Sequence, residues 1–209
     1  MCKSYYFEKD DEIVQAMTKS QLGIQMRNSL AAPVISYGKM LPGQIVPSIA
    51  LSKSGNRTVF PMVYGSINNH TLTTTAKLES VSTLDSYKEA WKSYRCAVPF
   101  SWYYENQRTT LNDKAFANNS RMLVQPKGLI YAYMAALYRK CSVGAAFVIL
   151  TTMASDSVKP LCDRMPVILP ESSIDMWINP SLKPIQSLRF ALRDMVVEPA
   201  LPDKPIQYY

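Results

Sequence analysis

The sequence is poor in the residues on which common catalytic and metal sites depend. It has one histidine, His70, and its four cysteines show no C-x-x-C spacing. Zinc sites need several Cys, His or acidic ligands at characteristic spacings, so we expect no bound metal. The glycine-rich dinucleotide pattern, the Walker pattern and the H-E-x-x-H pattern are also absent, and we expect no cofactor.

Long apolar runs are missing as well. The longest, Val143 to Leu150, is shorter than the ~18 residues that a membrane helix needs, and it is expected to form a buried strand. The opening residues, MCKSYYFEKDDE, contain no apolar core of the kind found in signal peptides. We therefore expect a cytosolic protein with no membrane partner, in which four cysteines do not predict a disulfide framework.

What the chain does contain favours strands and a polyanionic partner. Of its 209 residues 47% are hydrophobic and 19% are charged, which is typical of a globular protein. Fourteen prolines and 13 tyrosines, against seven glycines, favour strands and rigid turns over a helix bundle. The net charge of +7 favours nucleic acid or an anionic membrane surface as a partner.

The hydrophobic pattern predicts one α+β domain over residues 1–209, with an extensive and mostly antiparallel sheet. The predicted strands and loops are a long strand over 95–105, an exposed polar loop over 106–120, core strands within 129–138 and 145–153, and an exposed tail over 200–209. Edge strands and turns are expected around Pro33, Pro42, Pro47 and Pro61. The predicted helices are one capped by Asp10 or Asp11 with Ile13, Val14 and Met17 on one side, one capped by Asp85, and one that begins near Glu171.

Cys2 carries the most distinctive chemistry in the sequence. If Met1 is removed, Cys2 presents an α-amine, with an ordinary pKa of about 7.7–8.0, next to a thiol. Such a pair reacts with an aldehyde: the amine forms an imine, and the thiol then closes a thiazolidine ring in an intramolecular step. The alternative is that Cys2 is a small packing residue near a chain end.

Two further segments are candidates for a site. Glu105 ends an aromatic strand, and a carboxylate desolvated by aromatic neighbours suits general acid–base chemistry; the alternative is a solvated strand end. In CDRMPVILPE, Asp163 and Arg164 precede a buried strand, where the simpler interpretation is an ion pair.

Two clusters alternate cations with aromatic residues. Their members are Lys88, Trp91, Lys92, Tyr94 and Arg95 in the first and Tyr131, Tyr133, Tyr138, Arg139 and Lys140 in the second. Aromatic rings that stack on bases beside cations that bind phosphates suit single-stranded DNA. The alternative for each cluster is a solvated basic face with a core aromatic residue.

The order of these segments resembles the SRAP family, the SOS response-associated peptidases, whose members shield abasic sites in single-stranded DNA. Members begin Met-Cys-Gly-Arg, where this chain has MCKS, and carry Asn-Ala-Arg-x-Glu, where it has TAKLE at 75–79. They continue with a helix ending in tryptophan, an Arg-Cys strand and an aromatic-Glu end, here SYKEAWKSYRCAVPFSWYYE. A strand, a Thr-x-x-Ala segment and His-Asp-Arg-Met-Pro follow, here FVILTTMASDSVKPLCDRMPVILPE.

The resemblance implies a barrel-like sheet and a set of site residues. Family members form a thiazolidine between the cysteine and the ring-opened abasic sugar, and a glutamate and a histidine serve acid–base steps and the removal of Met1. The implied catalytic positions are Cys2, Glu105 and Cys162, the last at the family's histidine position. The implied DNA contacts are Thr75 to the sugar, Lys77 to a phosphate, Tyr64 to a neighbouring base, and Lys3.

Three positions depart from the family pattern. Cys162 replaces a histidine, and a thiol is a poorer proton shuttle than imidazole near pH 7. Thr75 replaces an asparagine and loses the amide fork, and Lys77 replaces an arginine and loses bidentate phosphate geometry.

Three hypotheses follow. The first is a monomeric protein of the DNA damage response that captures abasic sites covalently through Cys2. It has autopeptidase (hydrolase) activity on Met1. It is bacterial or phage-like and associates with the nucleoid when it is bound to DNA. The second is a degenerate module that binds single-stranded DNA without a covalent product. The third is a thiol hydrolase with Cys162 as nucleophile, for which the sequence places no activating histidine.

Overall fold

The computed structural model describes residues 4–68, 71–106, 121–141 and 144–200. The described residues do not include Cys2, Lys3 or His70. They also leave out the predicted loop at 106–120 and the predicted tail at 200–209, except for the first residue of each. Asn106 still belongs to a strand, so the predicted loop starts one residue too early.

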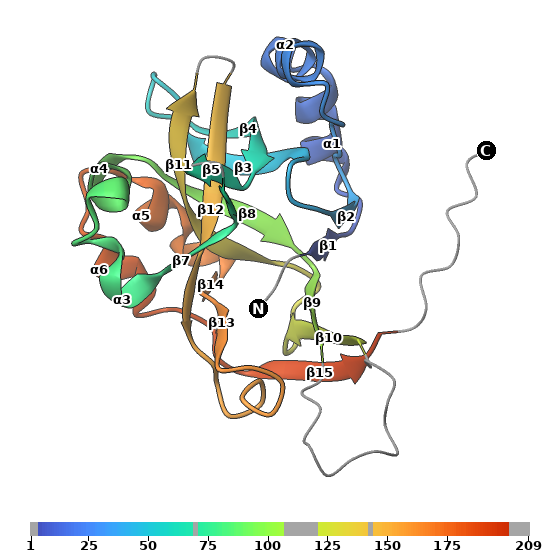
Figure 1. Ribbon diagram of the computed structural model, residues 1–209, viewed down its shortest axis with the longest axis vertical. Helices are drawn as coiled ribbons and strands as arrows, with labels where there is room; N and C mark the ends of the chain where they lie inside the picture. Colours follow the sequence, from blue (N-terminus) through green and yellow to red (C-terminus); the bar gives the residue numbers. More distant parts are fainter. Residues whose placement is uncertain (1–3, 69–70, 107–120, 142–143, 201–209) are drawn as a thin grey trace.

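Five strands close into a barrel (Figure 1). In spatial order they are β12 (Gly144–Met153), β4 (Arg57–Tyr64), β3 (Ile45–Leu51), β8 (Arg95–Phe100) and β11 (Ala132–Cys141). The ring is complete because β11 also pairs with β12. Parallel pairing occurs where β12 meets β4, and the other ring contacts are antiparallel. The predicted α+β fold, with a barrel-like and mostly antiparallel sheet, is confirmed.

Short strands extend the barrel at β12 and β11. They are β7 (Thr75–Lys77), β13 (Arg164–Pro166) and β14 (Ile168–Leu169). β7 runs parallel to β12, β13 pairs with the end of β12, and β14 pairs with β11. A separate hairpin is made by β5 (Ser66–Asn68) and β6 (Thr71–Thr73).

A second sheet has five strands. Their order is β15 (Met195–Pro199), β10 (Arg121–Pro126), β9 (Trp102–Asn106), β1 (Tyr5–Phe7) and β2 (Gly38–Met40). The single strand predicted over 95–105 is therefore two strands, which belong to different sheets. The break lies at the buried Ser101, whose N–H donates to the carbonyl of Tyr6 at 2.8 Å and whose hydroxyl accepts from the N–H of Glu8 at 3.0 Å.

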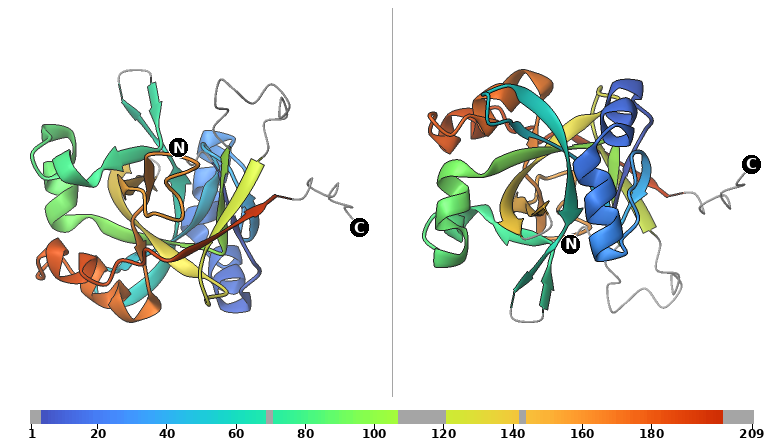
Figure 2. Two further views of the ribbon diagram at one scale, coloured as in Figure 1. Left: turned by 90° about the horizontal axis from the view of Figure 1, so that it is seen from below. Right: turned by 90° about the horizontal axis from the view of Figure 1, so that it is seen from above.

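The helices flank the barrel on two sides (Figure 2). One side carries α1 (Asp11–Thr18) and α2 (Gln21–Leu30); the other carries α3 (Leu78–Val81), α4 (Asp85–Ser93), a 3-10 turn (Glu171–Ser173), α5 (Ile174–Ile178) and α6 (Pro184–Leu188). No helix within the described ranges is long and apolar enough to cross a membrane.

One of the two predicted helix caps is confirmed. The Asp10 carboxylate accepts a hydrogen bond from the N–H of Ile13 at 2.9 Å, and Ile13 is buried against the barrel. The prediction for α4 is wrong: Leu84 occupies the cap position, and Asp85 is the first helical residue. In that place the Asp85 charge still favours the helix, because it faces the positive end of the helix dipole.

The proline prediction is wrong for Pro47 and Pro61. Both lie within barrel strands and face each other across β3 and β4. The register explains why this is tolerated, since β3 pairs with β8 at Ile49 and β4 pairs with β12 from Val63 onward. At Pro47, β3 is not paired with β8, and at Pro61, β4 is not paired with β12. The missing N–H groups of the two prolines therefore remove no hydrogen bond from these ladders.

Candidate functional site

Glu105 lies on β9 beside the N-terminal strand. β1 runs antiparallel to β9, with Tyr5 opposite Tyr103, and the N–H of Tyr104 donates to the carbonyl of Ser4 at 3.1 Å. Because side chains alternate along a strand, Glu105 points to the same side as the buried Tyr103, and it is 9% exposed. The first described residue of the chain, Ser4, is thus hydrogen-bonded to the neighbour of Glu105 in sequence.

Arg121 holds Ser4 from the opposite side of β9. Its guanidinium donates to the Ser4 hydroxyl at 3.0 Å and lies over the Tyr104 ring, 3.7 Å from the ring centre. The ammonium of Lys39 also lies over this ring, at 5.8 Å. Ser4 is therefore fixed through both its main chain and its side chain.

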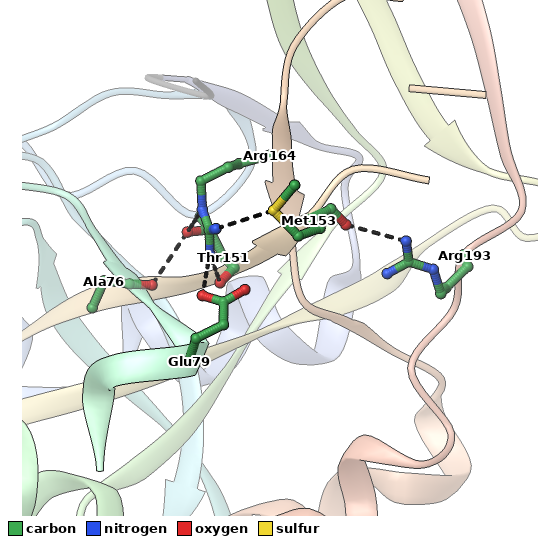
Figure 3. A network of polar contacts seen from close by, with 6 residues as sticks. All are labelled: Ala76, Glu79, Thr151, Met153, Arg164 and Arg193. Carbon is green, nitrogen blue, oxygen red and sulfur yellow. Dashed lines mark hydrogen bonds and ion pairs between the residues drawn. The ribbon is translucent and has the colours of Figure 1, made fainter. Parts of the chain in front are cut away.

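The TAKLE and CDRMP segments meet at β12 (Figure 3). Arg164 donates to the carboxylate of Glu79 at 2.7 Å, to the carbonyl of Thr151 at 2.7 Å and to the Thr151 hydroxyl at 3.2 Å. The Thr151 hydroxyl in turn donates to the carbonyl of Ala76 at 3.3 Å. These bonds tie together three segments that are far apart in sequence, and the ion pair of Arg164 is made with Glu79.

The charge of Arg164 changes the acidity of its partner. Burial acts to raise the pKa of Glu79, but the hydrogen bond and charge of Arg164, with a smaller contribution from Lys77, outweigh it. The pKa of Glu79 is therefore lowered from its ordinary value. Glu79 remains ionised and keeps α3 attached to β12 and β13.

The positions implied for DNA contact and proton transfer lie around this junction. Thr75 is half-buried at the start of β7 and Lys77 is exposed at its end, on the same side of the strand. Cys162 is 9% exposed, and its thiol donates to the carbonyl of Arg164 at 3.0 Å. Cys162 is thus part of the turn that leads into β13.

Tyr64 does not fit the role implied for it. Its ring is fully buried, stacked on Phe147 with the ring centres 5.3 Å apart and in edge contact with Tyr5 at 5.5 Å. Neither face of the ring is open to a base, because both neighbours belong to the core. We correct the expectation accordingly and leave Tyr64 out of the proposed DNA contacts.

Sequence reasoning named Arg164 but did not find the pairs of residues that hold the site together. Arg121 and Ser4 are separated by 117 positions, and Arg164 and Glu79 by 85, so no local pattern pairs them. Glu79 lies in TAKLE and Arg164 lies in CDRMP. The opposite charges of these two side chains were the signal from which their ion pair could have been predicted. In the part of the chain that the structure describes, no three His, Cys, Asp or Glu side chains gather as metal ligands would.

Comparison with known proteins identifies a family and several related proteins. The model of a family described as SOS response associated peptidase (SRAP) matches residues 1–202. The abasic site processing protein YoaM of Bacillus subtilis is 28% identical over 110 residues, which are 50% of this chain and 46% of that protein. The abasic site processing protein YoqW of Bacillus phage SPbeta gives 28% over 110 residues, 50% of this chain and 47% of that protein. The match thus spans about half the length of these curated relatives.

Solved structures share the fold. A protein from Bacteroides thetaiotaomicron has a TM-score of 0.69 at 19% identity, and the match covers 97% of this chain and 93% of that one. A phage-related protein from Bordetella bronchiseptica also has a TM-score of 0.69, at 16% identity, with 95% of this chain and 94% of that one covered. At this identity the likeness establishes the architecture of the barrel and its second sheet.

Proposed function

We propose that this chain, which belongs to the SRAP family of SOS response associated peptidases, captures abasic sites in single-stranded DNA covalently through Cys2. The observation that carries the proposal is the hydrogen bond between Ser4 and Tyr104, next to Glu105. Cys2 is two residues from Ser4, so chain geometry limits the separation of their Cα atoms to about 7 Å. A nucleophile at position 2 is therefore kept in the neighbourhood of the Glu105 carboxylate.

The chemistry begins with removal of Met1. Hydrolysis of the Met1–Cys2 peptide bond consumes one water and frees the Cys2 amine; it is performed by Glu105-assisted autoproteolysis or by a cellular aminopeptidase. The amine then adds to the aldehyde of the ring-opened abasic sugar, and loss of one water gives an imine. The thiol adds across the C=N bond, and its proton passes to the nitrogen. In this proposal Glu105 donates and accepts the protons of these steps.

The proposed DNA contacts lie on β7. The exposed ammonium of Lys77 binds a phosphate as a point charge, and the half-buried hydroxyl of Thr75 hydrogen-bonds to the opened sugar. Lys3, which lies outside the described residues, adds a second cation next to Cys2. The net charge of +7 supports a polyanionic partner.

The test is formation of a heat-stable adduct between the purified protein and a single-stranded abasic oligonucleotide. Intact mass first establishes whether Met1 is present. We expect an adduct with wild type, none with Cys2→Ala, and an adduct formed roughly 100-fold more slowly with Glu105→Gln, the usual size of a general acid–base contribution. Cys141→Ala removes a different, exposed thiol and is the control that should react as wild type does. A wild-type protein that lacks Met1 and still forms no adduct would sink the proposal.

A second candidate function rests on Cys162. Its thiol is mostly buried and donates to a main-chain carbonyl, at the position where the family has an imidazole. A site weakened in this way favours a module that binds single-stranded DNA without a covalent product. Such a module shows an affinity that falls steeply with salt and no adduct, so the same two measurements separate the candidates. Because the Cys162 thiol is mostly buried, the thiol hydrolase hypothesis lacks an exposed nucleophile.

A further inference from the structure

The two clusters of cations and aromatic residues in the sequence partly converge on one face. The N–H of Tyr138 on β11 donates to the carbonyl of Tyr94 at the end of α4 at 2.9 Å, and the two rings are 5.4 Å apart. The Lys140 ammonium lies over the Tyr94 ring at 5.0 Å, and the Arg139 guanidinium lies over the Tyr87 ring at 5.4 Å. These contacts set two cations, on opposite faces of β11, beside two tyrosines near the end of that strand.

A hollow opens between α4 and the end of β11. Its volume is about 330 Å³, and its lining consists of Asp85, Ser86, Glu89, Ala90, Tyr94, Arg139 and Lys140. This volume is within the range of sites for small ligands. The lining combines an aromatic ring, two cations, two carboxylates and a hydroxyl. A ligand whose charges are all of one sign would be repelled by two of these four charged groups.

We propose that this hollow binds one nucleotide of a single DNA strand, outside the abasic site. The three parts of a nucleotide match the three kinds of lining group. The base contacts the part of the half-buried Tyr94 ring that Tyr138 and Lys140 leave uncovered, the phosphate meets Arg139 and Lys140, and the carboxylates of Asp85 and Glu89 accept from amino groups on the edge of the base. The carboxylates also repel the phosphate, so the nucleotide has one favoured orientation.

The position of the hollow fits a strand that passes through the proposed capture site. On β12, Ala145 lies opposite Lys140 and Thr151 lies opposite Lys77, six residues apart and therefore on the same face of the sheet. The two positions are about 20 Å apart along the strand at ~3.4 Å per residue. Figure 1 shows α4, α3 and β7 on the same side of β12. A few nucleotides of extended single strand therefore join Lys77 to the hollow.

This inference rests on the proposed function, because the bound strand is the one that carries the abasic site. The test uses fluorescence anisotropy with an unmodified single strand of about 16 nucleotides, long enough for both sites, and one of about 2 nucleotides, too short to span them. Lys140→Gln alters an exposed side chain of the hollow, and Lys53→Gln alters an exposed lysine on the β3–β4 turn as the matched control. The long strand should bind roughly three- to tenfold more weakly to Lys140→Gln than to Lys53→Gln, with a salt slope lower by about one.

The outcomes separate this site from the capture reaction. The rate of adduct formation with a short abasic strand should be the same in Lys140→Gln as in wild type. Equal affinities of the two variants for the long strand would overturn the nucleotide site. If wild type forms no adduct while Lys140→Gln still loses affinity for the long strand, the capture proposal fails and the nucleotide site stands.

Discussion

Ser4 links the start of the chain to the rest of the site. Its carbonyl is bound by the main chain of β9 and its hydroxyl by Arg121, from β10. A reactive group two residues away gains rate when the backbone that follows it is fixed, because less conformational freedom is lost at the transition state. Arg121 is therefore a positioning residue in the proposed capture reaction.

The first prediction concerns Arg121. We expect Arg121→Gln to slow adduct formation about tenfold at saturating DNA, since a loosened N-terminal segment samples more orientations. Lys39→Gln removes the other cation over the Tyr104 ring but leaves the bond to Ser4, so it should keep the wild-type maximal rate. Single-turnover gel assays at several DNA concentrations give the maximal rate apart from affinity. If both variants change only affinity, Arg121 serves as a general phosphate contact instead.

The residues of the site were predictable from sequence to unequal degrees. Cys2 and Glu105 were proposed as site residues because the order of motifs carries them, and both assignments remain predictions. Arg121 was not found, since its partner is fixed only by the pairing of strands from opposite ends of the chain. Tyr64 was assigned an exposed face, whereas stacking on Phe147 places it in the core. Burial of an aromatic residue depends on tertiary neighbours that sequence spacing does not reveal.

At the scale of the elements, one ion pair, between Glu79 and Arg164, links α3 to the paired strands β12 and β13. Glu79 has a lowered pKa in the folded protein, so it binds a proton less readily there than in the unfolded chain. Its contribution to stability is complete above the ordinary carboxyl value and is lost as pH falls through the lower, folded value. The same sign applies to Glu171, where the hydrogen bonds of Arg57 and Tyr133 outweigh the effect of burial and lower the pKa.

The second prediction is a change in acid stability. Glu79→Gln should lower the urea midpoint at neutral pH and should also flatten its decline below about pH 4.5. Because the Glu79 side chain is 50% exposed, we expect a loss of about 0.5 kcal/mol or less after solvent screening. Glu198→Gln changes an exposed glutamate on β15 and serves as the control. Urea titrations of the three proteins between about pH 3 and pH 7 provide the measurement, and parallel curves would contradict the assignment.

Elements were predictable where the determining interactions are local. The cap of α1 depends on residues three positions apart, and the sequence was sufficient for it. The division between β8 and β9 depends on Ser101 bonding to the N-terminal segment, more than 90 positions away. The paired prolines of β3 and β4 depend on how far the neighbouring ladders extend, which is a property of the closed barrel.

At the scale of the whole molecule, Arg95 joins the barrel to the C-terminal helices. It is 2% exposed and donates to five main-chain carbonyls, those of Trp91, Lys92, Trp177, Asn179 and Leu182. Burial lowers its pKa to about 10, which still leaves it charged at neutral pH. The carbonyl oxygens compensate this charge, and the indole of Trp177 closes the site by donating to the carbonyl of Cys96 at 2.8 Å.

The third prediction tests this connection. Arg95→Lys keeps the charge but has three donors in place of five and loses the planar fork, so carbonyls that are now bound would lose their donor. We expect a loss of about 2–4 kcal/mol in the free energy of unfolding, from two or more such bonds. Arg189→Lys alters an exposed arginine just after α6 and should change stability little. Chemical denaturation followed by tryptophan fluorescence measures both, and equal stability of the two variants would refute the role of Arg95.

The placement of β1 between β9 and β2 has a consequence for the timing of maturation during protein synthesis. β9 follows β1 by roughly 100 residues, which a ribosome adds in about 5–20 s at ~5–20 residues per second. Through that interval the nascent chain lacks Glu105 and β9, the strand whose main chain binds Ser4, although β2 is already present. In the proposed maturation, a cellular aminopeptidase therefore has time to act on Met1 before Glu105 exists, and a Glu105→Gln protein made in cells should still lose Met1.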